Sequence, residues 1–308
     1  MSGRIAVVLA ILLVVARPAP AQPGSDAPTT RAIALPQHGG GTLILPTPAI
    51  RVITLAPHLA ELVFLAGAGD RLVATSEYSD HPAAAAALPR IGDAFRFDLE
   101  RLVQLEPDLV IAWASGNPDA ALAAMDDLGL PVWRTEVSTI EDMARLLREI
   151  GRATGRDAAA QATALERRWT RLEKRYANQR TVRFFYQVAE RPLYTVNGAH
   201  LISQGLTACG GSNVFRDLSS LAPQVGIEAV LDADPELLVT GRLDDGADPL
   251  ARWRAWPRMA AVRDEAFVYL PADLINRATP RMLDAVEEAC EAFEALRGRQ
   301  KAAGERAR

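Results

Sequence analysis

The sequence predicts an α/β protein of two similar lobes, joined by a single long helix, with a ligand cleft between the lobes. Helix-like and strand-like apolar runs alternate over residues 48–139 and again over residues 180–300. A helical stretch, residues 140–179, separates these two regions, and a segment of the first region recurs in the second. Alternating helices and strands are typical of a parallel sheet that helices cover.

In the first region, strand and helix patterns follow one another in order. Strands are expected at residues 51–57, 71–78, 108–113 and 130–136, and helices at 58–69, 98–107 and 119–129. The first helix ends in Gly67 and Gly69, and glycine is typical of a helix C-terminus. Ahead of this lobe, residues 22–47 combine a polar leader with two short apolar runs around glycines, which predict a hairpin.

Residues 140–179 predict helix with a break near Thr154-Gly155-Arg156. The second part, about residues 157–178, is long and charged on one side, and its position favours a rigid helix between two Rossmann-like lobes. A crossover helix inside one domain is the alternative. In the second lobe, strands are expected at 181–189, 236–241 and 266–270, helices at 201–211, 227–235 and 280–297, and a tail at 301–308.

An internal repeat supports two related lobes. The stretch "DLERLVQLEPDLVIAW" (98–113) aligns without gaps to "GIEAVLDADPELLVTG" (226–241), so that Glu100 falls on Glu228 and Pro107 on Pro235. Each copy predicts a short helix, a turn and a buried strand, which is a common combination. The matched glutamate favours relatedness over chance, and two lobes around a cleft are a binding architecture.

Residues 1–21 are typical of a secretory signal peptide and predict a periplasmic protein. Arg4 precedes the apolar run Ile5–Ala16, and Ala19-Pro20-Ala21 is a cleavage pattern. An uncleaved anchor is the alternative, and a lipid anchor is not expected because no cysteine follows the run. Cleavage would leave 32 basic and 38 acidic side chains, a net charge of −6. A mildly acidic chain without a basic run does not favour nucleic acid or an anionic membrane surface as partner.

The chain contains two cysteines, Cys209 and Cys290, and both fall in helix-like segments. In an oxidising compartment such a pair suggests one disulfide bond, with two separate buried thiols as the alternative. No C-x-x-C pattern of a redox or zinc site is present. We expect no metal site and no resident cofactor.

Candidate ligand-binding residues lie at strand ends, because ligands of open parallel sheets bind beyond the carboxyl ends of the strands. They are Tyr78, Trp113, Tyr194, Asp273 and Arg277, together with Phe95 and Phe97 in the loop before Asp98, an expected helix N-cap. Tyr and Trp walls with a few charges suit a large, partly apolar ligand with polar edges. Each aromatic ring alone is equally well explained as core filler. Within "EYSDHP" (77–82), we expect Tyr78 to face the ligand and Asp80 to hold its own turn.

Several motifs together resemble the periplasmic binding proteins of ABC importers for iron chelates and cobalamin. They are "RVITLAPHLAELVFLAGAG", "EYSDHP", "LPRIGD", "LERLVQLEPDLVIAWASGNP", "GLTACGGSNVF", "PQVGIEAVLDADPELLV" and "RATPRMLDAVEEAC". The resemblance covers roughly residues 48–297. The patterns "YSD-x-P" and "DLVIAW-x-x-GN" are moderately specific for the cobalamin-binding branch, whereas "LEPDLVI" indicates only the wider superfamily.

The resemblance implies a binding protein and no enzyme, with two lobes that close little on their ligand. It implies that Tyr78, Trp113, Tyr194, Asp273 and Arg277 contact a corrinoid and that Cys209 and Cys290 form a disulfide. It also implies that Glu100 and Glu228 dock onto arginines of the two membrane subunits of the importer.

The sequence departs from the cobalamin-binding pattern at two places. Phe95 and Phe97 occupy a loop in which the pattern has tryptophan, and Ala222 occupies another tryptophan position. A corrinoid with a different lower base, a precursor such as cobinamide, or a siderophore therefore remains open as the ligand.

Two other functions are considered. In a haem or ferric-siderophore binder, Tyr78 or His81 would be an iron ligand, and Arg96 and Arg277 would face an anionic chelate. An enzyme is not favoured, because the chain has no complete glycine-rich phosphate loop, no G-x-S-x-G and no H-E-x-x-H. The histidines, His38, His58, His81 and His200, are scattered, and for His58 near a helix start a capping or structural role is expected. We expect a monomer.

Overall fold

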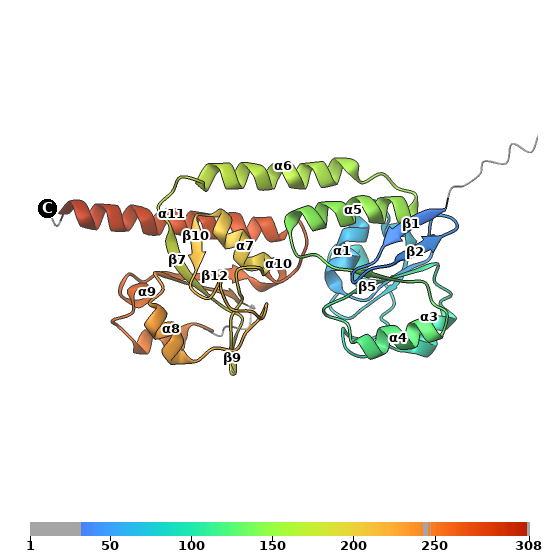
Figure 1. Cartoon of the computed structure of the whole chain (residues 1–308), viewed down its shortest axis with the longest axis horizontal. Coiled ribbons are helices and arrows are strands. Elements are labelled where there is room, and N and C mark those ends of the chain that lie inside the picture. Colours follow the sequence, from blue (N-terminus) through green and yellow to red (C-terminus); the bar gives the residue numbers. More distant parts are fainter. Residues whose placement is uncertain (1–31, 243–245, 247, 307–308) are drawn as a thin grey trace, which may run out of the picture. The chain divides into compact units, whose positions relative to one another are not determined.

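The structure is a computed structural model that describes residues 32–242, 246 and 248–306, all of which belong to one compact unit, Ala32–Arg308. The unit contains two four-stranded sheets, each entirely parallel and accompanied by helices (Figure 1). This arrangement confirms the predicted α/β fold class. The predicted signal peptide, residues 1–21, lies outside the described residues. No helix within the described part is long and apolar enough to span a membrane.

The sheet of the N-terminal lobe has the strand order β4-β3-β5-β6. Its elements are β3 (Val52–Thr54), α1 (Pro57–Leu65), η1 (Gly69–Arg71), β4 (Leu72–Thr75), α2 (Ala83–Ala86), α3 (Leu99–Gln104), β5 (Leu109–Trp113), α4 (Asp119–Asp127) and β6 (Val132–Thr135). Along β5, Leu109 and Ile111 join one apolar cluster and Val110 joins the other. Successive side chains of a strand point to opposite faces, so both faces of this sheet are buried under helices.

The predicted hairpin is present as β1 (Ile33–Pro36) and β2 (Thr42–Leu45), which pair antiparallel. Leu35 and Leu45 of the hairpin are buried in the main apolar core. The Nε1 of Trp133 in β6 donates a hydrogen bond to the carbonyl of Pro36 over 2.9 Å. The hairpin is therefore part of the N-terminal lobe and not a detached leader.

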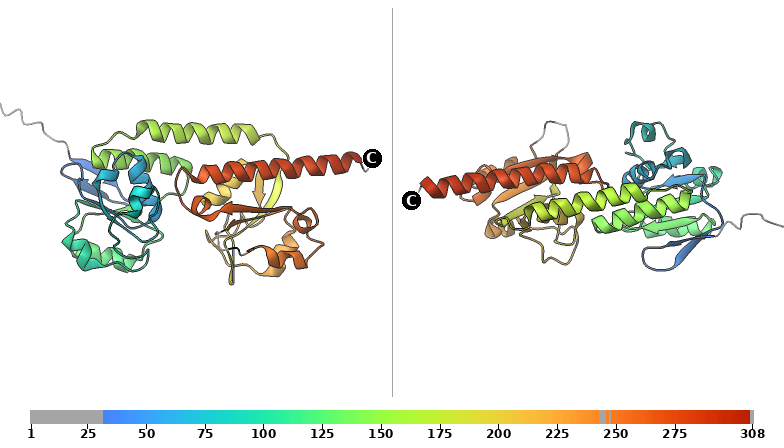
Figure 2. Two further views of the ribbon diagram at one scale, coloured as in Figure 1. Left: turned by 180° about the vertical axis from the view of Figure 1, so that it is seen from behind. Right: turned by 90° about the horizontal axis from the view of Figure 1, so that it is seen from above.

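Two helices, α5 (Ile140–Thr154) and α6 (Ala159–Tyr176), connect the lobes. Thr139 and Asp142 form a capping box at the start of α5, and Gly155 ends it with a φ of 70°, a conformation that favours glycine. Figure 2 shows α6 alongside α5 at one end and alongside α11 (Met282–Arg306) at the other.

Ion pairs near the middle of α6 fasten it to a helix on either side. Arg148 of α5 pairs with Glu166 over 2.7 Å, and Arg168 pairs with Glu287 of α11 over 2.8 Å. The first pair joins α6 to the N-terminal side and the second joins it to the C-terminal lobe. The predicted helix at about 157–178 is thus a connecting element that is bonded to both sides.

The sheet of the C-terminal lobe has the order β10-β7-β11-β12. Its elements are β7 (Val182–Gln187), β8 (Ala189–Glu190), β9 (Leu193–Tyr194), α7 (Leu201–Ala208), β10 (Gly211–Asn213), α8 (Ile227–Ala233), β11 (Leu237–Arg242), η2 (Ala251–Ala255), α9 (Ala260–Arg263), β12 (Phe267–Pro271), α10 (Ala272–Ile275) and α11. Strand β10 was not expected, because Gly211-Ser212-Asn213 carries no apolar alternation.

The final helix is longer than predicted and runs through residues 301–306, for which the sequence predicts a tail. The segment from Gln300 to Arg306 consists largely of Ala, Lys, Gln, Glu and Arg, all good helix formers, so nothing in it ends the helix apart from the weak penalty of Gly304. The tail assignment was wrong for this reason.

A disulfide bond joins Cys209 and Cys290, whose Cα atoms are 4.8 Å apart. Cys209 follows the last residue of α7, and Cys290 lies in α11. Both side chains are fully buried in the core, and the bond ties α7 to the final helix. The predicted pairing is confirmed, and the alternative of two separate thiols is not.

Replacing both Cys209 and Cys290 by alanine should lower the free energy of unfolding by about 2–4 kcal/mol, because the bond closes a long loop in the unfolded chain. Urea unfolding of the variant and the oxidised parent measures this difference. Thiol titration of the denatured, unreduced parent should find no free thiol. Two reactive thiols in that titration would contradict the pairing.

Candidate functional site

Trp113, the last residue of β5, is fixed in position by its neighbours. Its backbone N–H donates to Asn117 Oδ1 over 2.8 Å, and its Nε1 donates to Glu136 Oε1 over 3.2 Å. A Cβ added at Gly116 would lie 2.0 Å from the indole ring. In "WASGN", the Trp113 ring therefore lies against Gly116, which has no side chain to obstruct it. Glu136, which follows the neighbouring strand β6, orients the ring through its hydrogen bond.

Asn117 organises the neighbouring loop. Its side chain is 4% exposed, and its Nδ2 donates to the carbonyls of Leu55 and Ala94 over 3.1 and 3.2 Å. This fixes the start of the loop that carries the two predicted phenylalanines. Phe95 is 71% exposed, whereas Phe97 is half-buried against the second apolar cluster. Of the two rings, Phe95 is the one available to a ligand.

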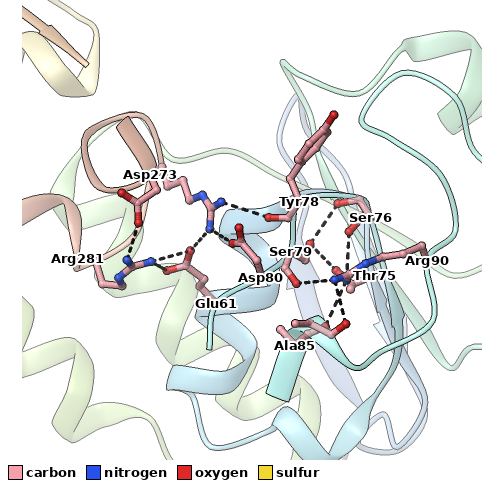
Figure 3. Close-up of polar contacts among 12 residues, drawn as sticks. Glu61, Thr75, Ser76, Tyr78, Ser79, Asp80, Ala85, Arg90, Asp273 and Arg281 are labelled. Carbon is pink, nitrogen blue, oxygen red and sulfur yellow. Dashed lines mark hydrogen bonds and ion pairs between the residues drawn. The ribbon is translucent and has the colours of Figure 1, made fainter. Parts of the chain in front are cut away.

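The turn in "EYSDHP" is held by Ser79 and Arg90 (Figure 3). Ser79 is fully buried and accepts a hydrogen bond from Thr75 Oγ1 over 2.8 Å, while Arg90 Nη2 donates to the Ser79 carbonyl over 3.0 Å. Tyr78 takes a φ of 62° and leaves its ring 76% exposed. The aromatic side chain is thereby presented to solvent by a turn that is itself fixed.

Asp80 does not hold this turn as its main role, and that expectation was wrong. Its Oδ1 accepts a hydrogen bond over 2.7 Å from Arg277, which lies 197 positions further along the chain. The hydrogen bond from Arg277 is the main reason that the pKa of Asp80 lies below its ordinary value of 3.8. The expectation failed because it considered only neighbouring residues, whereas the partner of Asp80 is Arg277 of the other lobe.

Glu61 of α1 is the centre of this contact between the lobes (Figure 3). Its side chain is 4% exposed, and its carboxylate accepts hydrogen bonds from Arg277 over 2.9 Å and from Arg281 over 3.3 Å. Arg277 also donates to the carbonyl of Tyr78, and Arg281 also pairs with Asp273 over 2.9 Å. A buried carboxylate requires such partners, because an unpaired charge is costly away from water.

Residues of both lobes enclose a cavity of about 260 Å³ next to this ion cluster. The N-terminal lobe contributes His58, Trp113 and Glu136, and the C-terminal lobe contributes His200 and Arg277. Leu201, Leu221, Ile275 and Met282 supply apolar surface. A mainly apolar cavity with a few convergent polar groups is the usual form of a small-molecule site.

The seven predicted binding residues divide into three groups. Trp113 and Arg277 line the cavity. Tyr78 and Phe95 are exposed rings outside its lining, and Asp273 is exposed and paired with Arg281. Phe97 and Tyr194 are half-buried, and Tyr194 lies in the β8–β9 pair with a further bridge to Gln224.

Six polar residues of the cavity were not assigned to it from the sequence: His58, Ser115, Glu136, Ser138, His200 and Asn276. Glu136 follows directly after β6, so the strand-end rule that selected Trp113 could also have selected it. His58 was expected to cap a helix or serve as structure. It does not cap α1, whose N-cap is Ala56 with no side-chain hydrogen bond. Its ring packs against Trp113, as a structural residue would, and also lines the cavity.

The two cavity histidines are held in the neutral form. Burial, with a contribution from the nearby Arg277 charge, lowers the pKa of His58 to about 4. Burial also lowers the pKa of His200, whose Nδ1 accepts a hydrogen bond from the backbone N–H of Ile202 over 3.2 Å. At neutral pH neither ring adds positive charge to the cavity.

The repeat-related glutamates have matching local positions. Glu100 is exposed in the first turn of α3, and Glu228 is exposed in the first turn of α8. A carboxylate is favoured there by the helix dipole. Both side chains are accessible for an intermolecular contact.

Replacing His58 by glutamine should make stability less dependent on pH. His58 has a pKa of about 4 in the folded protein against 6.5 ordinarily, so between these values the unfolded chain binds the extra proton and stability falls as pH falls. Urea unfolding near pH 7 and near pH 5 measures the loss in each protein. His200 is present in both and cancels. Equal losses in parent and variant would contradict the buried neutral state of His58.

Comparison with known proteins identifies the family. Residues 52–274 match the family described as "Periplasmic binding protein". The "Vitamin B12-binding protein" of Vibrio parahaemolyticus is 39% identical over 256 residues, 81% of this chain and 91% of that protein. The crystal structure of the periplasmic vitamin B12 binding protein BtuF of Vibrio cholerae aligns with a TM-score of 0.74 and 36% identity over 81% of this chain and 98% of that one.

A haem-bound relative has the same fold at lower identity. The periplasmic heme-binding protein BhuT, in complex with two hemes, aligns with a TM-score of 0.69 and 21% identity, over 80% of this chain and 98% of that one. At this identity the likeness concerns the fold alone. The match over residues 52–274 and the relative at 39% identity establish that the chain belongs to the periplasmic binding protein family.

Proposed function

We propose that this protein binds a corrinoid, cobalamin or a close relative, in the periplasm and delivers it to an ABC importer. The named relatives at 38–39% identity support this ligand class. In this role the chain is a binding protein without catalytic activity, resident cofactor or metal, and it acts as a monomer without nucleic acid. The signal peptide is removed on export.

The charge of the cleft is the observation that favours a corrinoid over haem or a ferric siderophore. Arg277 is the one Lys or Arg side chain among the described residues that line the cavity, and Glu61 and Asp80 both pair with it. Glu136 adds a further carboxylate to the wall. Haem has two carboxylates and many ferric siderophores are anionic, so such ligands would meet no uncompensated cation here. A corrinoid presents neutral amides at its edge and fits this cleft better.

The alternative of an iron ligand from "EYSDHP" gains no support from the geometry. His81 is exposed and does not line the cavity. Among the described residues, no group of three or more His, Cys, Asp or Glu side chains is arranged to hold a metal ion. Arg96, the other cation considered for an anionic chelate, is also outside the cavity lining.

For the ligand contacts, we propose Trp113 and Arg277 at the cavity and the exposed rings of Tyr78 and Phe95 at its approach. Phe97, Tyr194 and Asp273 complete the set that the family resemblance implies. The two rings are large apolar groups that loops of one lobe leave exposed.

Replacing Trp113 by alanine should weaken corrinoid binding by about 5- to 150-fold, which corresponds to 1–3 kcal/mol of lost apolar contact. Calorimetric titration with cyanocobalamin and with cobinamide measures it. Leu128→Ala, an exposed apolar residue outside the cavity lining, is the control and should bind as the parent does.

Haem added to the parent in the same titration should bind more weakly than either corrinoid. Tighter binding of haem, read by calorimetry and its Soret absorption, would contradict the proposed ligand. Parent-like corrinoid affinity of the Trp113 variant would contradict the assignment of the cleft.

The double variant Glu100→Ala, Glu228→Ala should bind corrinoid normally but impair uptake through the cognate importer. Charged rim groups act on encounter and register, so the defect relative to the parent should be largest at low ionic strength and shrink as salt screens the parent's charges in a reconstituted assay. Glu141→Ala removes another exposed first-turn glutamate, that of α5, and is the matched control. Normal uptake by the double variant at limiting ligand would contradict the docking role. Both glutamates would then only stabilise the first turns of their helices.

A further inference from the structure

His58 is placed on the cavity wall by the start of α1. It is the second residue of that helix, which follows the carboxyl end of β3 after a short connection. The ring is 8% exposed and meets the Trp113 ring edge-on, with centroids 5.2 Å apart and planes at 86°. Trp113 is itself held by Asn117 and Glu136, so the imidazole rests against a fixed surface.

Neither ring nitrogen of His58 hydrogen-bonds to any of the described residues. This distinguishes it from His200, whose Nδ1 is occupied by the start of α7. Neither nitrogen is among the fully buried polar atoms that lack a partner, so both keep some accessible surface and can be reached from the cavity. Because the ring lines the cavity, a bound ligand is the partner that would satisfy it.

The two charged groups of the wall are already engaged by the protein. Glu136 accepts hydrogen bonds from Trp113 Nε1 and from the backbone N–H of Ser115. Arg277 donates to Glu61, Asp80 and Tyr78. Unlike these two charged groups, the His58 ring keeps its hydrogen-bonding capacity for recognition.

The chemistry of a neutral imidazole defines what it recognises. It offers one N–H donor and one nitrogen acceptor, and burial beside Arg277 keeps the ring neutral. A carboxamide also offers both a donor and an acceptor, whereas a carboxylate offers acceptors alone. A carboxamide can thus satisfy either tautomer of the ring, and a carboxylate only one.

We propose that His58 is a specificity-determining residue that hydrogen-bonds a peripheral carboxamide of the bound corrinoid and so favours amide-bearing ligands over their carboxylate analogues. The inference rests on the proposed function and adds to it a chemical group of the ligand and the residue that reads it.

The test compares cyanocobalamin with its monocarboxylic acid derivatives, in each of which one peripheral amide is replaced by a carboxylate. The parent should bind at least one of these acids more weakly than cyanocobalamin. His58→Phe keeps an aromatic ring against Trp113 but removes both polar atoms. It should weaken cyanocobalamin binding by about 2- to 10-fold, the range for one hydrogen bond between neutral groups, and affect that acid less. The ratio of the two affinities should therefore shrink.

Two further variants separate recognition from packing. His58→Gln restores a donor and an acceptor and should recover most of the preference for the amide. His38→Phe changes an exposed histidine of the β1–β2 turn and should leave every affinity unchanged. Thermal unfolding midpoints of all proteins establish that each variant is folded at the temperature of the titration.

The outcomes distinguish this inference from the proposed function. If the parent binds corrinoids, and His58→Phe and His58→Gln both bind cyanocobalamin and its acids with the parent's affinities, the role of His58 is overturned while the ligand class stands. If the parent binds no corrinoid, the proposed function fails and the inference fails with it.

Discussion

The bond between Glu61 and the two arginines of the C-terminal lobe is the contact on which the site depends. Glu61 lies on α1 with its carboxylate almost fully buried, and Arg277 and Arg281 reach it from the other lobe. A carboxylate in this position is stable only while its partners stay in place, since removing one partner of a buried pair typically costs about 3–5 kcal/mol. A buried ion pair adds little net stability, but arrangements that separate the partners are costly. The main effect of the cluster is therefore to hold the residues around the cleft in one arrangement.

The same cluster determines the electrostatics of the cavity. Arg277 is an obvious group for binding an anion, yet its hydrogen bonds go to Glu61, Asp80 and a backbone carbonyl. With its charge offset, what remains on the wall is an indole ring, apolar side chains, two neutral imidazoles, one carboxylate and the neutral polar residues Ser115, Ser138 and Asn276. Such a surface suits a large ligand with a neutral amide edge, and it explains how a fold shared with haem-binding proteins can serve another ligand.

Much of the fold could be predicted from local pattern. The alternation of helix and strand, the repeat that pairs Glu100 with Glu228, and the break near Gly155 led to two parallel sheets and a connecting helix, and the structure contains them. The cysteine pair was predictable because few alternatives exist for two cysteines in an oxidising compartment. Short elements such as β10 were missed because three residues carry no periodicity.

The site was less predictable, because its key interactions join residues far apart in the sequence. The strand-end rule located Trp113, but Asp80 was assigned to its own turn since its partner, Arg277, is 197 positions away. Glu61 reads as one polar residue within an apolar helix, and His58 as a residue at a helix start. Only the three-dimensional contacts between α1 and the C-terminal lobe show that Glu61 pairs with arginines of that lobe and that His58 lines the cavity.

A crystal structure of the protein with bound cobinamide would test this account most directly, since cobinamide presents the amide-bearing ring without the lower base. The account predicts the corrin edge against Trp113, an amide within hydrogen-bond distance of His58, and Arg277 still bonded to Glu61. A ligand bound away from this cavity, or bound through an Arg277 released from Glu61, would contradict it.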